Sequence, residues 1–127
     1  MPSAETLARF IARVEQNAHV EAIEEFYRPE ASMQENMNAP RLGRDALVAN
    51  ERRVLGTTKT VQSRCVGPVF VSGDLVVIRW HFRFEAHDGT VRELEELSYQ
   101  QWQGEQVLRE QFFYDPAQFA PRAASAA

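Results

Sequence analysis

The stretch LVVIRWHFRFEAHDGTVRELEELSYQQWQGEQVLREQFFYDP, residues 75–116, decides the fold. Apolar and polar residues alternate along most of it, as they do in strands whose two faces meet different surroundings. Asp88-Gly89 is a strong hairpin signal, because a type I′ turn needs positive φ at both central residues. Gly104-Glu105 is a weaker turn signal between two alternating runs. The stretch therefore predicts three antiparallel strands joined by two tight turns.

Two-residue turns would fix the register of these strands, and the register assigns each side chain to a face. The predicted pairs beside the turns are His87 with Thr90 and Gln103 with Gln106. One face is then aromatic and apolar with carboxylates set in it: Val76, Ile78, Trp80, Phe82, Phe84, Glu95, Leu97, Tyr99, Leu108, Glu110, Phe112 and Tyr114. The other face is mixed: Arg79, His81, Arg83, Glu96, Ser98, Gln100, Trp102, Arg109, Gln111 and Phe113. A single β-bulge would shift the assignment beyond it.

Composition narrows the class of protein. At 127 residues, with 44% hydrophobic and 25% charged residues, the chain is a single soluble domain with a core of its own. A net charge of −4 without a basic run argues against a nucleic-acid partner. The single cysteine, Cys65, favours a reducing compartment. The sequence shows neither the order of a signal peptide nor an apolar run long enough to span a membrane, so we expect a cytoplasmic protein without membrane contact.

The remaining segments predict helices on one side of this sheet. Apolar spacing predicts a helix over residues 4–16, a second ending at Pro29 and a third over 43–55. A short strand over 31–38 and a long one over 60–71 complete the order. We therefore predict an α+β domain over residues 1–118, in which a curved antiparallel sheet and three helices enclose a conical pocket. Residues 119–127 are predicted to be a flexible tail that Phe119 anchors locally.

This pattern resembles the nuclear transport factor 2-like superfamily, in its SnoaL-like and ketosteroid-isomerase-like branch. The segments that carry the resemblance are HVEAIEEFYRPEASM, APRLGRDAL, CVGPVFVSGD and EELSYQQWQGEQVLREQFFYDP. The resemblance implies a cone-shaped domain, often dimeric through its outer sheet face, with a pocket on the inner face. Members include isomerases, polyketide cyclases, dehydratases and epoxide hydrolases, together with many proteins without catalytic activity, so the fold alone does not decide the function.

Glu35 is the first catalytic candidate. It precedes the Gly43-Arg44-Asp45 that opens the third helix, where the resemblance places a catalytic carboxylate. If Met33 and Met37 face inward, Glu35 does too, and poor solvation would raise its pKa toward that of a general base. The alternative is a glutamate in contact with water at the mouth of the cavity.

Glu95 and Tyr114 are the other catalytic candidates. Glu95 resembles in position the protonated acid that donates to the oxyanion in ketosteroid isomerase, a known example of a carboxylic acid kept neutral by its surroundings. Tyr114 offers a phenolic donor within an apolar cavity. The isomerases use a tyrosine of the first helix for this purpose, whereas this helix offers Phe10 and Ile11. The alternative is that Glu95 is charged and wet and that Tyr114 belongs to the wall.

A set of mainly apolar residues is predicted to contact the ligand: Met33, Cys65, Trp80, Phe82, Leu97, Tyr99, Glu110 and Phe112. Glu110 lies opposite Tyr99 in the predicted register and is expected either to hydrogen-bond it or to act as a second acid or base. The three histidines are scattered, so neither a metal site nor a cofactor is predicted.

Two functions remain open on the sequence. The first is an isomerase or cyclase in which Glu35 removes a proton next to a carbonyl of a small hydrophobic molecule and Glu95 or Tyr114 stabilises the enolate. The second is a non-catalytic module that binds a hydrophobic ligand or forms a homodimer. Its dimer contact would lie on the outer sheet face, with Trp102, Phe113 and Arg109.

Overall fold

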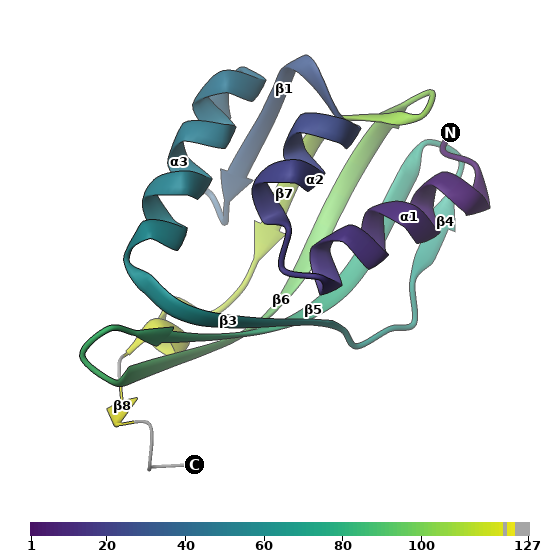
Figure 1. Ribbon diagram of the computed structural model, residues 1–127. Coiled ribbons are helices and arrows are strands. Elements are labelled where there is room, and N and C mark those ends of the chain that lie inside the picture. Colours follow the sequence, from purple (N-terminus) through teal and green to yellow (C-terminus); the bar gives the residue numbers. More distant parts are fainter. Residues whose placement is uncertain (121, 124–127) are drawn as a thin grey trace.

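The computed structural model describes residues 1–120, 122 and 123, and it has the predicted α+β architecture (Figure 1). Three helices lie on one side of a curved sheet, and the sheet leaves its other face open. The elements are α1 (Ala4–Glu15), α2 (His19–Phe26), β1 (Tyr27–Glu35), β2 (Arg41–Leu42), α3 (Arg44–Gly56), β3 (Thr58–Cys65), β4 (Phe70–Ser72), β5 (Leu75–Ala86), β6 (Thr90–Gln103), β7 (Gln106–Phe113), the 3₁₀ helix η1 (Pro116–Phe119) and β8 (Arg122–Ala123).

The sheet is mixed, with the strand order β2-β1-β7-β6-β5-β3. In addition, β4 pairs with β5 and β8 pairs with β6. The pairs are antiparallel except that β1 runs parallel to β7, which the prediction of a wholly antiparallel sheet missed. This parallel pair brings the end of β1, and with it Glu35, alongside Phe112 in β7.

Helix α1 begins where the sequence predicts. The Ser3 side chain accepts a hydrogen bond from the Thr6 N–H and so caps the helix. The Glu105 carboxylate, in the β6–β7 turn, accepts hydrogen bonds from the Ser3 N–H at 2.8 Å and from its hydroxyl at 2.9 Å. The same carboxylate also bonds the Thr6 hydroxyl. The start of α1 is therefore fixed to the far end of the central hairpin.

Helix α2 ends at Phe26, three residues before the predicted end at Pro29. Tyr27 already has an extended backbone and is the first residue of β1. Its buried hydroxyl donates to Glu110 of β7, and this contact across the sheet overrides the local helical pattern. The predicted long strand over 60–71 is likewise two strands, β3 and β4, separated at Gly67-Pro68.

The predicted register of β6 is wrong by one residue. Glu85 pairs with Val91 and Phe82 with Leu94, so His87, Asp88 and Gly89 form a three-residue loop instead of a two-residue turn. The Gly89 N–H bonds the Ala86 carbonyl at 3.0 Å across this loop. Because side chains alternate, a shift of one residue moves the whole of β6 to the opposite face.

A β-bulge restores the predicted face of β7. Gln103 pairs with Gln106 as predicted, but the register shifts between Gln101 and Trp102. Beyond the shift, Glu110 pairs with Gln100 rather than with Tyr99. The loop and the bulge together turn β6 over and leave Glu110 and Phe112 facing inward, as the sequence predicts.

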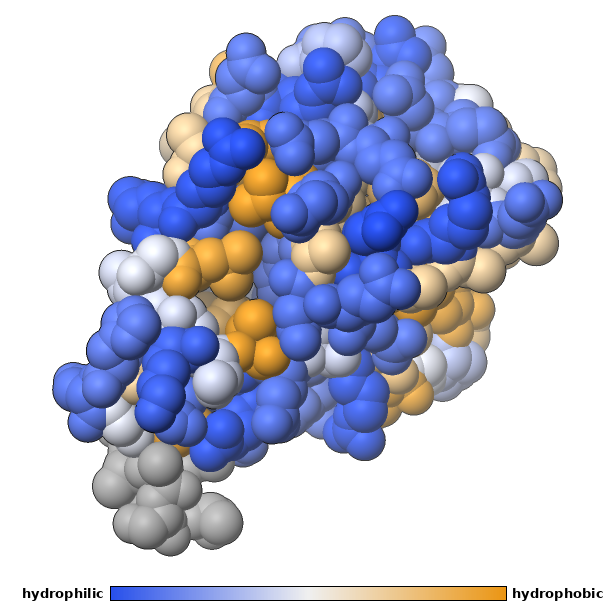
Figure 2. Space-filling view, in the orientation of Figure 1, coloured by the Kyte–Doolittle hydropathy of each residue, from blue (hydrophilic) through white to orange (hydrophobic). Residues whose placement is uncertain are grey.

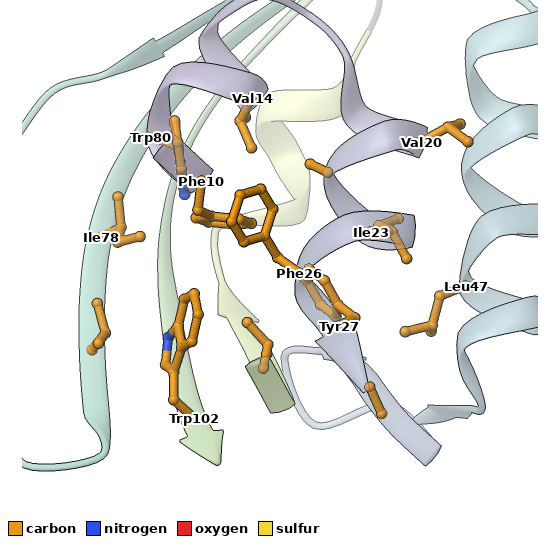
Figure 3. Close-up of a cluster of buried hydrophobic side chains, with 14 of the residues drawn as sticks. Phe10, Val14, Val20, Ile23, Phe26, Tyr27, Leu47, Ile78, Trp80 and Trp102 are labelled. Carbon is orange, nitrogen blue, oxygen red and sulfur yellow. The ribbon is translucent and has the colours of Figure 1, made fainter. Parts of the chain in front are cut away.

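The main core lies between the helices and the inner face of the sheet (Figure 3). The Phe10 ring of α1 meets Phe26 and Trp102 edge to face, at centroid distances of 5.5 Å and 5.8 Å. Trp102 is buried, so its predicted place on the outer face is wrong, as follows from the register of β6. In the view of Figure 2, hydrophilic residues cover most of the helical side, with small groups of hydrophobic residues between them.

The segment after β7 returns to β6. The Phe119 ring packs edge-on against Tyr114 at 5.4 Å, and β8 pairs with Thr90 and Val91. Beyond the end of β7, the Gln118 side-chain amide takes its place beside β6. It accepts a hydrogen bond from the Glu95 N–H at 2.9 Å and donates one to the Glu95 carbonyl at 3.0 Å. Residues 121 and 124–127 of the predicted tail lie outside the described residues. Among those described, no helix combines the length and the apolar character needed to cross a membrane.

Replacing Phe10 with alanine should lower the free energy of unfolding by about 3–5 kcal/mol, because it empties the space between Phe26 and Trp102. Leu42→Ala is the matched control, since Leu42 is 71% exposed, and should change stability by less than about 0.5 kcal/mol. Urea denaturation measures both values. Equal effects of the two substitutions would contradict this core.

Candidate active site

A cavity of about 590 Å³ lies between the inner face of the sheet and the helices. All three helices, β1, β5, β6, β7 and the segment through η1 contribute to its lining. Apolar and aromatic side chains make up most of the wall, and polar and charged groups are set among them. A site of this size and lining suits a small, mainly apolar molecule.

The β5 side of the cavity is a row of aromatic rings. Trp80, Phe82 and Phe84 are successive inward residues of β5, and each stacks on the next. The ring centroids are 5.7 Å apart for Trp80 and Phe82 and 6.1 Å apart for Phe82 and Phe84. The row lines the cavity from its buried part toward the end of β5 at Ala86.

Glu110 forms the buried floor of the cavity and is fully hydrogen-bonded. One carboxyl oxygen accepts from the Tyr27 hydroxyl. The other accepts from the Ser98 hydroxyl at 2.5 Å and from the Gln100 amide at 2.7 Å. Burial raises the pKa of Glu110, and these three donors oppose that rise. The expected glutamate–tyrosine hydrogen bond therefore exists, but its partner is Tyr27 and not Tyr99.

Glu96 differs from Glu110 because its carboxyl group has no partner. It lines the same cavity and is only 9% exposed, yet no described residue hydrogen-bonds or ion-pairs with it. Burial, reinforced by the charge of Glu110, raises the pKa of Glu96 to about 8. At neutral pH this carboxyl group is therefore mostly protonated and free to donate a hydrogen bond into the cavity.

Tyr114 and Glu35 belong to the same region. Leu97 pairs with Phe113 at the end of β7. Tyr114, the next residue, therefore lies opposite Glu96. Burial raises the pKa of Tyr114, and the charges of Glu35 and Glu96 add to the rise. Glu35 lines the cavity at the end of β1, where it is 40% exposed and lies 3.9 Å from the Arg41 guanidinium. It is thus a solvated carboxylate near the mouth, close to a buried protonated one.

The helical side adds a second polar group. His19 of α2 places Nδ1 3.2 Å from the Glu51 carboxylate of α3 and Nε2 2.7 Å from the Ser63 hydroxyl of β3. His19 and Glu51 line the cavity, whereas Ser63 does not. A serine nucleophile is therefore not presented to a ligand here. The arrangement joins α2, α3 and β3 and holds Glu51 against the cavity.

Most of the predicted site residues line this cavity. They are the catalytic candidates Glu35 and Tyr114 and the predicted ligand contacts Met33, Trp80, Phe82, Glu110 and Phe112.

Four predicted site residues do not line it. Glu95, Leu97 and Tyr99 lie on the outer face of β6, because the three-residue loop shifts the register. Glu95 is 45% exposed and pairs with Arg79 at 2.8 Å, a hydrogen bond that lowers its pKa. Cys65 faces the core from β3 as predicted and packs against it, but it is not part of the cavity wall.

The sequence interpretation missed Glu96, Ser98 and Gln100 because polar residues occupy the inner face of β6. It took the apolar outer residues Leu97 and Tyr99 for the inner set. One signal in the sequence pointed the other way: Trp102 shares the alternation of Glu96, and so large a ring is usually buried. His19 and Glu51 are 32 residues apart and come together only through helix packing.

Comparisons with known proteins agree with this geometry. The model of the SnoaL-like domain matches residues 7–109. The chain belongs to the SnoaL-like family. No curated protein matches the chain significantly. No group of three or more His, Cys, Asp or Glu within residues 1–120 and 122–123 is arranged to hold a metal ion.

Solved structures with low sequence identity share the fold. A protein of Catenulispora acidiphila with a ketosteroid isomerase-like fold, in complex with trimethylamine, is 14% identical, with a TM-score of 0.76 over 92% of this chain and 90% of that one. A Mesorhizobium loti protein named as a putative SnoaL-like polyketide cyclase is 20% identical (TM-score 0.74; 90% and 100% covered). An epoxide hydrolase of M. tuberculosis is 9% identical (TM-score 0.74; 91% and 84% covered).

Replacing Glu96 with glutamine should stabilise the protein at alkaline pH. The folded-state pKa of Glu96 lies above the unfolded value of 4.5, so the folded state binds the extra proton between these pH values and stability falls as pH rises through them. Glu96→Gln removes this loss, so its advantage should grow from near zero at pH 5 to as much as about 5 kcal/mol above pH 8. Urea denaturation at several pH values measures it.

Glu95→Gln is the matched control, one residue away on the opposite face. The pKa of Glu95 is lowered, so its carboxylate contributes stability above its unfolded pKa, and that contribution is lost as pH falls through the folded value. This variant should be slightly less stable than the parent at neutral pH and equal to it in acid. The same pH dependence for both variants would refute the placement of Glu96.

Proposed function

We propose that this protein binds a small, mainly apolar carbonyl compound in the cavity and moves a proton next to the carbonyl group, as an isomerase or cyclase does. The observation that carries the proposal is Glu96, a protonated, unpartnered carboxyl group in an aromatic-walled cavity that also holds a solvated carboxylate. A pair of acids whose surroundings keep one neutral and the other charged is a recurrent basis for acid–base chemistry.

Each group has a defined role in this reaction. The Glu35 carboxylate removes the proton from the carbon next to the carbonyl, and the C–H electron pair forms the carbon–carbon double bond of the enolate. The negative charge moves to the carbonyl oxygen, which accepts hydrogen bonds from Glu96 and Tyr114. In an isomerase, protonated Glu35 returns the proton to another carbon of the enolate. In a cyclase, the enolate carbon attacks a second carbonyl and forms a ring, and the oxygen of that carbonyl takes the proton from Glu35.

Glu96 takes the part that the sequence interpretation gave to Glu95. The aromatic row of Trp80, Phe82 and Phe84 would hold the apolar part of the substrate and keep water from the carbonyl. The protein named as a polyketide cyclase and the epoxide hydrolase among the structural neighbours support the use of this fold as an enzyme cavity. The single cysteine supports action in the cytoplasm.

Exchange of carbon-bound protons tests the reaction directly. In D₂O the protein should catalyse the exchange of protons for deuterium next to the carbonyl of 4-benzylcyclohexanone. Proton NMR measures this exchange as the loss of the corresponding signals. Glu35→Gln should lower the rate about 100-fold or more, because it removes the base. The parent's rate should fall above pH 8, where Glu96 ionises, because an anion cannot donate to the enolate.

Glu96→Gln distinguishes the donor from a merely structural residue. The glutamine amide still donates a hydrogen bond but does not ionise, so the variant should retain part of the rate and lose the alkaline fall. Glu95→Gln should behave as the parent. If the parent exchanges protons no faster than a Glu35→Gln/Glu96→Ala double variant does, the proposed reaction is contradicted.

A non-catalytic role in self-association is the second candidate, and it concerns the outer face of the sheet. Leu97, Tyr99 and Phe113 are exposed there, and Leu97 pairs with Phe113 on the neighbouring strand. Such an apolar group on an open sheet face supports a homodimer in which two outer faces meet.

Sedimentation equilibrium tests this surface. The parent should sediment as a dimer and the Leu97→Lys/Phe113→Lys double variant as a monomer, because four buried charges would oppose each dimer contact. Leu42→Lys, on exposed β2, should leave the dimer intact. A monomeric parent, or a dimeric double variant, would contradict the proposed interface.

A further inference from the structure

The cavity contains more acidic than basic groups. Its ionisable side chains are Glu35, Glu51, Asp88, Glu96 and Glu110 on the acidic side, and His19, Arg41 and Arg92 on the basic side. Both arginines already have partners: Arg41 lies near Glu35, and the Arg92 guanidinium donates to the Phe119 carbonyl at 3.1 Å. The basic groups therefore do not balance the acids deeper in the cavity.

Two of the acids are already accounted for. Asp88 accepts hydrogen bonds from the Thr90 N–H at 2.9 Å and from its hydroxyl at 2.8 Å, within the β5–β6 loop. Glu110 accepts from three donors on the floor of the cavity. Neither group needs a ligand to be satisfied.

Glu35 lies near Arg41, which leaves Glu51 and Glu96. Glu96, nine-tenths buried and unpartnered, points to a polar group of a ligand. Glu51 is held by His19 through Oε1, and in the described part of the chain no lysine or arginine forms an ion pair with it. Its carboxylate contributes to the raised pKa of Glu96, Glu110 and Tyr27, so its negative charge acts on the buried part of the cavity.

Aromatic rings line the same cavity as this carboxylate. His19, which holds Glu51, meets the Phe82 ring edge-on at 5.5 Å, and Phe82 stacks between Trp80 and Phe84. The face of an aromatic ring attracts a cation, and the attraction is stronger where water is excluded. A carboxylate that shares a cavity with Trp80, Phe82 and Phe84 therefore favours a positively charged nitrogen with apolar substituents.

We propose that the substrate carries, besides its carbonyl group, a positively charged amine that Glu51 pairs with against the aromatic row of Phe82 and Phe84. The inference rests on the proposed function for the carbonyl, which Glu96 and Tyr114 contact. The ammonium group compensates the Glu51 carboxylate and stabilises the nearby enolate. Anionic substrates are disfavoured, because the cavity holds more acidic than basic groups and Glu51 has no lysine or arginine partner among the described residues.

Three ketones that each join a benzyl group to a six-membered ring ketone test the charge preference. They are the permanently charged N-benzyl-N-methyl-4-oxopiperidinium, neutral 4-benzylcyclohexanone and anionic 4-[(4-oxocyclohexyl)methyl]benzoate. Isothermal titration calorimetry of the parent should show the cation binding about tenfold more tightly than the neutral ketone and no binding of the anion. The quaternary nitrogen does not titrate, so a preference reports the protein's charges alone.

Glu51→Gln should weaken binding of the cation about tenfold and leave the affinity for the neutral ketone within about twofold. An unchanged affinity for the neutral ketone also shows that the variant is folded. Glu21→Gln is the matched control: it changes the same charge on the exposed face of α2 and should leave all affinities unaltered.

The outcomes separate the two proposals. The proposed amine site is wrong if the neutral ketone binds the parent as tightly as the cation does, or if the Glu51→Gln variant still prefers the cation. The proposed carbonyl chemistry is not affected by either result. If no probe binds and no deuterium exchange occurs, the proposed function fails and the amine site fails with it.

Discussion

The pairing of Trp80 with Glu96 across β5 and β6 is the constraint on which the site depends. It follows from the three-residue loop at His87–Gly89, because a loop one residue shorter would place Glu95 in the cavity instead. The inner face then receives Glu96, Ser98 and Gln100, and the outer face receives Leu97 and Tyr99. A single residue in a surface loop thus decides which carboxyl group meets a ligand.

The two inward glutamates of β6 and β7 differ in whether their carboxyl groups have hydrogen-bond partners. Glu110 is buried with three donors, and it ties the α2–β1 junction to the sheet through Tyr27. Glu96 is buried without a donor, and its ionisation is costly in the folded protein. A fold retains such a group at the expense of stability where a ligand supplies the missing partner.

The sequence predicted the elements better than their faces. Apolar spacing located α1, and alternation located β5 to β7, because these are local properties of the chain. The predicted end of α2 was wrong because the hydrogen bond from Tyr27 to Glu110 joins residues far apart in the sequence. The parallel pairing of β1 with β7 is also a long-range choice that leaves no local pattern.

Within the site, the residues of β5 and β7 were found because their apolar alternation marks the inner face. Two shifts of one residue, at the loop and at the bulge, cancel in β7 but not in β6. Glu96 was therefore missed by one position. Glu51 could not be found from spacing, since helix packing alone brings it to His19 and into the cavity wall.

The central claim is that Glu96 is a protonated acid in the cavity at neutral pH. Carbon-13 NMR of the glutamate side-chain carboxyl groups, titrated from pH 4 to 10, tests it most directly, with Glu96→Gln to assign the signal. The account predicts that the assigned carboxyl group titrates at about pH 8. Titration near 4.5, the ordinary value for glutamate, would show a solvated carboxylate and contradict the account.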